Sequence, residues 1–102
     1  MKKYCSIIYN PATANFKPKE LDQTASVFSQ EYEVDKRQSE YQGHVLSLVK
    51  EANQDSDLIV TFGGDGTFGE AVSGIFDQNQ FYHVKHLSFH HLSQIHHLGY
   101  LL

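Results

Sequence analysis

The stretch that decides the fold is Leu58-Ile59-Val60-Thr61-Phe62-Gly63-Gly64-Asp65-Gly66-Thr67, where an apolar run gives way to a cluster of glycines. The run is nearly continuous, as expected of a β-strand that is buried on both faces of a parallel sheet. Five of the seven glycines fall between Gly63 and Gly74, directly after this strand. Glycine there permits positive φ and lets a ligand approach the backbone without a Cβ in the way. Ala71, Val72 and Ile75 follow with helical spacing, so the sequence predicts a strand, a turn and a short helix.

The turn has the chemistry of a phosphate site. Successive exposed N–H groups and the start of a helix create partial positive charge. Asp65 would repel an anion unless its carboxylate holds Mg²⁺, bonds to ribose or loop N–H groups, or assists a hydroxyl nucleophile. Thr67 can cap the helix or donate to a phosphate oxygen. The alternative is an ordinary glycine-rich turn with Asp65 or Thr67 as a helix cap. Neither the Walker A motif nor the dinucleotide fingerprint fits the spacing.

Upstream of this stretch, strand and helix patterns alternate. Helices are predicted from Pro18 to about Gln30 and from Gly43 to Asn53, and strands at Tyr4–Tyr9, Tyr32–Lys36 and Leu58–Phe62. Strands that alternate with helices favour parallel pairing with crossovers. The expected fold class is α/β, a Rossmann-like three-layer arrangement with a parallel sheet between flanking helices.

Composition narrows the function classes. The chain has 102 residues, about one domain, with a net charge of −4 and no large basic cluster, so nucleic-acid binding is not expected. Cys5 has no partner for a disulfide and is expected to be a buried small apolar residue. No run is long enough for a signal-peptide core or a spanning helix, which predicts a cytoplasmic protein.

The chain changes character near residue 78. All twelve acidic residues lie at or before Asp77, whereas six of the seven histidines lie at or after His83. We therefore expect an incomplete nucleotide-binding domain at 1–77 and a His/Leu-rich tail at 78–102. The tail is interpreted as non-native sequence, with a divergent strand and helix, including an edge strand from Phe81, as the alternative. His86 and His90 have a two-ligand helical spacing, but no known zinc signature matches, so no metal site is predicted.

Four motifs together resemble one family. Gly63-Gly64-Asp65-Gly66-Thr67 after an apolar strand resembles the signature of the diacylglycerol kinase catalytic-domain family. Ile7-Ile8-Tyr9-Asn10-Pro11 is similar to the family's first strand, which ends in Asn-Pro. Ser39 to His44 is similar to its Thr/Ser-x-x-x-Gly-His segment, and Glu70 with Gly74 matches its Asn-Glu-x-x-x-Gly stretch. The resemblance covers about residues 4–76.

The resemblance implies an ATP-dependent lipid kinase that moves the γ-phosphoryl group of Mg-ATP to a lipid hydroxyl. It implies that Asp65 is catalytic and that the ATP site also contains Asn10, Ser39, Gly63, Gly64, Gly66 and Thr67. His44 is expected to be structural rather than to contact the nucleotide. Ala14 and Gly69 depart from the family pattern, which has glycine and asparagine at these places.

The family continues into a further loop motif and a second, mostly β domain, which carry lipid-binding residues and any peripheral membrane contact. The chain lacks that loop motif, so we expect the partial N-terminal domain of a two-domain kinase, inactive alone. The lipid and the oligomeric state are not specified by the sequence. Phe68 after the signature gives an alternative resemblance to NAD kinase. A non-catalytic nucleotide-binding protein or remnant is the third interpretation.

Overall fold

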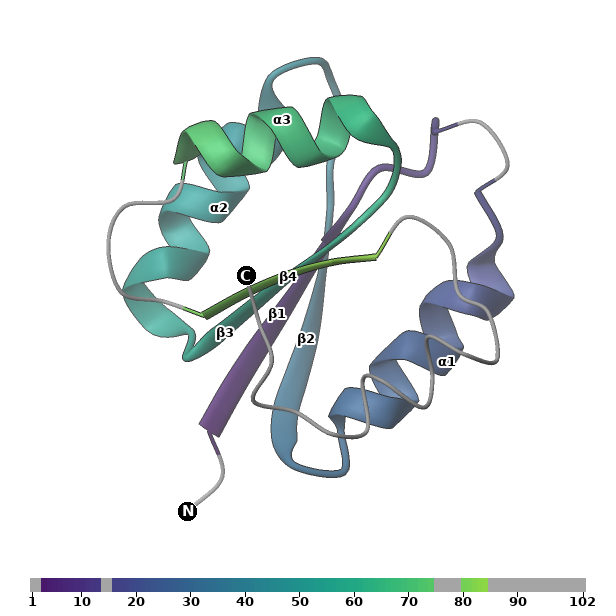
Figure 1. Ribbon diagram of the computed structural model, residues 1–102, viewed down its shortest axis with the longest axis vertical. Coiled ribbons are helices and arrows are strands. Elements are labelled where there is room, and N and C mark those ends of the chain that lie inside the picture. Colours follow the sequence, from purple (N-terminus) through teal and green to yellow (C-terminus); the bar gives the residue numbers. More distant parts are fainter. Residues whose placement is uncertain (1–2, 14–15, 75–79, 85–102) are drawn as a thin grey trace.

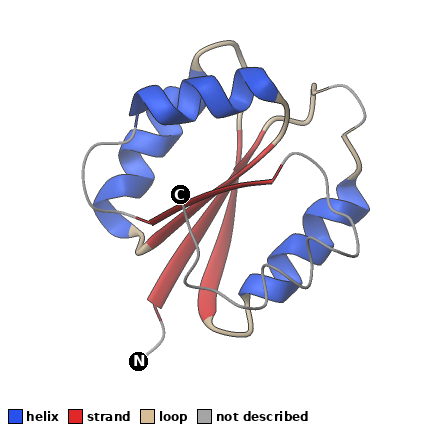
Figure 2. Cartoon of the chain, in the orientation of Figure 1, coloured by secondary structure: helices blue, strands red, loops and turns tan. Residues whose placement is uncertain are grey.

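The computed structural model describes residues 3–13, 16–74 and 80–84, which form a parallel sheet with helices on both faces (Figures 1 and 2). The described elements are β1 (Lys3–Tyr9), α1 (Pro18–Phe28), β2 (Tyr32–Gln38), α2 (His44–Asp55), β3 (Leu58–Phe62), α3 (Asp65–Gly74) and β4 (Gln80–Val84). The four strands have the order β2-β1-β3-β4, and every neighbouring pair is parallel.

The apolar pattern of β3 explains its central place. All five of its residues are buried, because helices cover it from both sides. On one face, Leu58, Val60 and Phe62 pack with Leu21 and Phe28 of α1. On the other face, Ile59 packs with apolar side chains of α2 and with one of α3, namely Val45, Leu48, Val49, Ala52 and Ala71. The three-layer α/β fold predicted from the order of the elements is therefore confirmed.

Most element bounds agree with the sequence patterns, and the differences lie at the ends. The predicted strand at Leu58–Phe62 is confirmed without change, and β2 and α2 each extend two residues beyond their predicted ends. Val72, which its spacing grouped with Ala71 on a short helix face, is 49% exposed, while Ala71 is buried. Ile75 lies outside the described residues.

Cys5 is buried in β1, as expected from its apolar surroundings. Removal from water, with a smaller contribution from the negative charge of Asp35, raises the pKa of the Cys5 thiol to about 12. This cysteine is therefore a packing residue with a firmly bound proton. Among the described helices, none combines the length and the apolar character needed to cross a membrane.

The expected tail is described only at its start. Strand β4 includes Phe81 and His83, and His83 pairs in register with Thr61 of β3. Residues 85–102, with the remaining histidines of the tail, lie outside the described part of the chain. The boundary at residue 77 and the non-native origin of the tail stay predictions.

Candidate functional site

The carboxyl ends of β1, β2 and β3 are level with one another. Tyr9, the last residue of β1, pairs with Gln38 of β2 and with Phe62 of β3. Two hydrogen bonds continue this alignment, since the Asn10 N–H donates to the Phe62 carbonyl at 3.4 Å and the Ser39 N–H donates to the Tyr9 carbonyl at 2.8 Å. The segments that follow the three strands therefore start side by side, at the edge where ligands bind in open parallel sheets.

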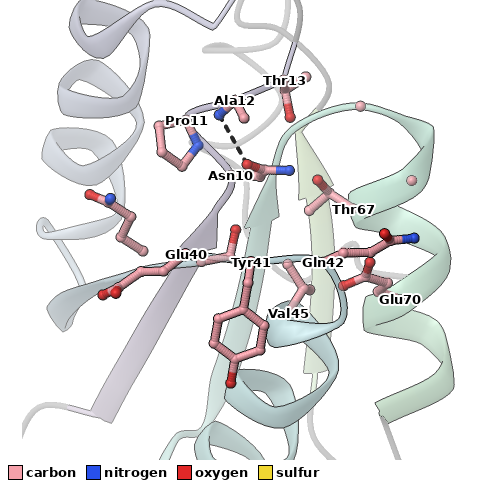
Figure 3. A pocket seen from close by; sticks show the side chains of 14 residues that line it. Asn10, Pro11, Ala12, Thr13, Glu40, Tyr41, Gln42, Val45, Thr67 and Glu70 are labelled. Carbon is pink, nitrogen blue, oxygen red and sulfur yellow. Dashed lines mark hydrogen bonds between the residues drawn. The ribbon is translucent and has the colours of Figure 1, made fainter.

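The segment after β1 is a tight turn closed by Asn10. The Asn10 Oδ1 accepts the Ala12 N–H at 3.0 Å, and the Asn10 carbonyl accepts the Thr13 N–H at 3.2 Å. Proline at position 11 suits such a turn because it fixes φ. Since Oδ1 is used within the turn, the side-chain NH₂ of Asn10 is directed away from it, toward Thr67 in Figure 3. Asn10 can thus order its own loop and still donate to a ligand.

The segment after β2, residues 39–43, leads into α2. The Glu40 N–H donates to the His44 Nδ1 at 2.9 Å, and the rings of Tyr41 and His44 stack with centroids 4.3 Å apart. Gly43, at the N-cap of α2, has a φ of +90°, which side chains rarely tolerate. The Ser-x-x-x-Gly-His motif is therefore a structural unit. The contacts of His44 with Glu40 and Tyr41 agree with the expectation that this histidine is structural.

The glycine signature connects the end of β3 to the first turn of α3. Helix α3 begins at Asp65, so Asp65, Gly66 and Thr67 form its first turn, and Phe68 donates its N–H to the Gly64 carbonyl. Gly64 thus holds the N-cap position, and neither Asp65 nor Thr67, the two residues offered as caps in the alternative, occupies it. The positive φ that glycine permits is not used in the signature, because Gly43 alone shows it among the glycines that the structure describes.

The glycines instead allow close packing. A Cβ on Gly63 would lie 2.6 Å from Thr67 Oγ1, and one on Gly64 would lie 3.3 Å from Thr13 Cγ2. A Cβ on Gly66 would meet nothing within 4 Å. Gly63 is therefore required by the protein's own packing, whereas Gly66 borders open space.

These segments surround a pocket of about 660 Å³ (Figure 3). Four parts of the chain contribute: the turn after β1, the segment between β2 and α2, the start of α2, and the first half of α3. The lining residues are Asn10, Pro11, Ala12, Thr13, Gln38, Ser39, Glu40, Tyr41, Gln42, Val45, Gly64, Gly66, Thr67 and Glu70.

Five of the predicted site residues come together in this pocket: Asn10, Ser39, Gly64, Gly66 and Thr67. Gly63 is not in the lining, because it is buried behind Thr67. The backbone of Asp65 opens α3, and its side chain lies outside the description. Glu70 was not predicted as a site residue, although it lies one helical turn after Thr67. That i, i+3 spacing was the signal that could have found it.

The electrostatics of the pocket are mixed. The first amides of α3 have no partner within their own helix and carry partial positive charge. Glu40 and Glu70 add carboxylates to the lining. A phosphate with bound Mg²⁺ fits this arrangement better than a bare anion does, because the cation offsets the carboxylates. Among the described side chains, no group of three His, Cys, Asp or Glu could hold a metal.

Known proteins are similar to this chain in fold and in sequence. The model of the diacylglycerol kinase catalytic domain matches residues 5–91, beyond the boundary expected at residue 77. A curated protein from Staphylococcus haemolyticus (strain JCSC1435), named diacylglycerol kinase, is 35% identical over an alignment of 81 residues that covers 76% of this chain and 24% of that protein. The crystal structure of a diacylglycerol kinase from Bacillus anthracis str. Sterne has a TM-score of 0.73 at 20% identity, covering 82% of this chain and 33% of the other.

The chain thus spans about a quarter of its curated relative and a third of the solved structure. At 20% identity the solved structure shows a common fold. The family match rests on sequence and takes in most of the chain, including every motif that surrounds the pocket. The chain belongs to the diacylglycerol kinase catalytic domain family.

Proposed function

We propose that this chain binds Mg-ATP in the pocket at the carboxyl edge of its sheet, as the nucleotide-binding part of a diacylglycerol-kinase-like lipid kinase. The observation that supports it most is the meeting of three strand ends with the open first turn of α3. A pocket of about 660 Å³ has room for a ligand of nucleotide size.

The described residues suggest separate roles in this site. The amides of Gly66 and Thr67 and the Thr67 hydroxyl would donate to phosphate oxygens, at the place where Gly66 leaves room for them. Asn10 and Ser39, which line the pocket after the ends of β1 and β2, would hold the rest of the nucleotide. Mg²⁺ bound with ATP supplies charge neutralisation for the phosphates. In this proposal the residues of the chain supply orientation and hydrogen bonds.

The proposed reaction forms a bond between a lipid hydroxyl oxygen and the γ-phosphorus, breaks the bond between that phosphorus and its bridging oxygen, and releases ADP. Asp65, at the first turn of α3, is the residue proposed to take the hydroxyl proton. Because the chain spans 24% of its curated relative, nucleotide binding is proposed for the chain itself. Lipid phosphorylation is proposed for a longer protein, in which this chain is joined to the further domain that completes the length of its relatives. We propose that this longer protein acts in the cytoplasm.

Titration calorimetry of the chain with Mg-ATP tests nucleotide binding. Thr67→Val keeps the buried shape but removes the hydroxyl, so we expect affinity to fall about tenfold, as for one hydrogen bond to a charged group. Thr67→Ser should stay close to the wild type. Thr24→Val is the matched control, since Thr24 is a buried threonine on α1 whose hydroxyl donates to the Glu20 carbonyl outside the pocket. A folded wild-type chain that binds no Mg-ATP would overturn the proposal.

A second assay tests the acceptor. The chain is incubated with Mg-[γ-³²P]ATP and either diacylglycerol in mixed micelles or NAD. We expect no transfer by the chain alone, and transfer to diacylglycerol once the remaining length of the curated relative is fused to it. Transfer to NAD would favour the NAD-kinase alternative. Binding without any transfer by the fusion would favour a non-catalytic nucleotide-binding protein.

A further inference from the structure

Glu70 connects two walls of the pocket. It is half-buried on α3, one helical turn after Thr67, and its Oε2 accepts the N–H of Gly43 at 3.3 Å. Gly43 lies 27 residues earlier, at the junction between the pocket segment 39–43 and α2. This bond therefore joins the phosphate side of the pocket to its opposite wall.

The bond replaces a cap that α2 lacks within its own sequence. In a capping box, a Glu or Gln at the third helical position accepts the N–H of the N-cap residue. The N-cap of α2 is Gly43, so the third helical position is occupied by Leu46, which has no acceptor, and the helix has no side-chain cap of its own. Glu70 supplies the missing acceptor from a neighbouring helix.

The contact also holds an unusual backbone conformation. Gly43 has a φ of +90°, and a Cβ there would meet nothing within 4 Å, so the conformation is not imposed by crowding at the Cβ position. The other end of the segment is held by the bond from Glu40 to His44 and by the bond from Ser39 to Tyr9. The His44 N–H also donates to the Tyr41 carbonyl at 3.0 Å, so these bonds fold the segment on itself. The bond from Gly43 to Glu70 ties this folded segment to α3.

We propose that Glu70 is a positioning residue, which sets the distance between the segment 39–43 and the first turn of α3 through its bond to Gly43. This inference rests on the proposed nucleotide site and deepens it. A wall fixed before binding costs less entropy when the ligand arrives, so the bond raises nucleotide affinity without a contact to the nucleotide.

The test combines amide exchange with nucleotide binding in the 102-residue chain. Glu70→Ala removes the acceptor, so hydrogen exchange of the Gly43 amide, measured by NMR, should become at least tenfold faster, while core amides of β3 keep their protection. Affinity for Mg-ATP should fall about tenfold. Glu70→Gln keeps an acceptor of the same length and should restore both values to within about threefold of the wild type. Glu51→Ala, which removes a carboxylate from the exposed face of α2, is the control and should change neither.

The outcomes separate the two proposals. If the wild type binds no Mg-ATP, the proposed function fails. Hydrogen exchange of the Gly43 amide in Glu70→Ala still decides, in that case, whether the contact with Glu70 positions this wall. If Glu70→Gln loses as much affinity as Glu70→Ala, the charge of Glu70 matters rather than its bond, and the inference is overturned. Unchanged exchange at Gly43 in Glu70→Ala also overturns it.

Discussion

Replacing Gly63 with alanine tests whether the signature glycines serve the protein or its ligand. A Cβ at this position would lie 2.6 Å from Thr67 Oγ1, 2.9 Å from Thr67 Cβ and 3.2 Å from Thr67 Cγ2. A rotation about χ1 of Thr67 can move the two outer atoms, but the Cβ is fixed to the backbone of α3. Gly63→Ala must therefore shift α3 or the end of β3.

Overpacking of this kind costs about 1–3 kcal/mol. For a domain of this size, each kcal/mol lowers the melting temperature by about 4–8 °C, so a decrease of about 4–24 °C is expected. Gly66→Ala is the matched control, since its Cβ would meet nothing within 4 Å and its φ is not positive. Replacing a glycine at such a helical position stabilises by about 0.4–1 kcal/mol. Mg-ATP affinity, however, should fall in Gly66→Ala, because the new methyl group enters the pocket.

Thermal unfolding followed by circular dichroism measures both variants, and calorimetry measures their affinity for Mg-ATP. The double variant Gly63→Ala/Thr67→Ala adds a check, because removal of Oγ1 and Cγ2 should recover part of the lost stability. A Gly63→Ala chain that melts with the wild type would refute the packing argument. A Gly66→Ala chain that binds Mg-ATP like the wild type would refute the assignment of the open space to the ligand.

Three further outcomes follow from the described contacts. Gly43→Ala should lower the free energy of unfolding by about 1–2 kcal/mol in urea titrations, because its φ of +90° strains a side chain even though the space is open, and Gly43→Asn should lose less. Burial raises the pKa of the Cys5 thiol from 9.0 to about 12, so the folded chain keeps a proton that the unfolded chain releases. The contribution of this thiol to stability is therefore complete below about pH 9 and is lost as the pH rises toward about 12, so unfolding free energies measured across that range should fall more steeply in the wild type than in Cys5→Ala. Gly64→Ala, whose Cβ would lie 3.3 Å from Thr13 Cγ2, should destabilise less than Gly63→Ala in the same melting experiment, since a side-chain methyl group of the loop can move away.

The order of elements could be predicted because burial dictates residue type in this sheet. The run at Leu58–Phe62 is apolar on both faces since α1 packs on one and α2 with α3 on the other. The ends of the elements were less certain, because no residue of β2 is fully buried, the alternation of half-buried and exposed residues breaks at Asp35 and Lys36, and its last two residues are polar. The exposure of Val72 could not be predicted, since it depends on how α3 is rotated about its own axis, and one short helix gives a weak periodic signal.

The candidate site could be predicted in part, because motifs report which segments matter but not which constraint each residue meets. Gly63, Gly64 and Gly66 look equivalent in the sequence, yet one packs against Thr67, one lies close to Thr13, and one borders the pocket. The contact of Glu70 with Gly43 spans 27 residues of sequence and depends on the packing of α3 beside α2, so no local pattern predicts it. A glycine motif at a strand end therefore combines the demands of the fold with those of the ligand. Only substitutions that separate stability from affinity, position by position, can tell the two apart.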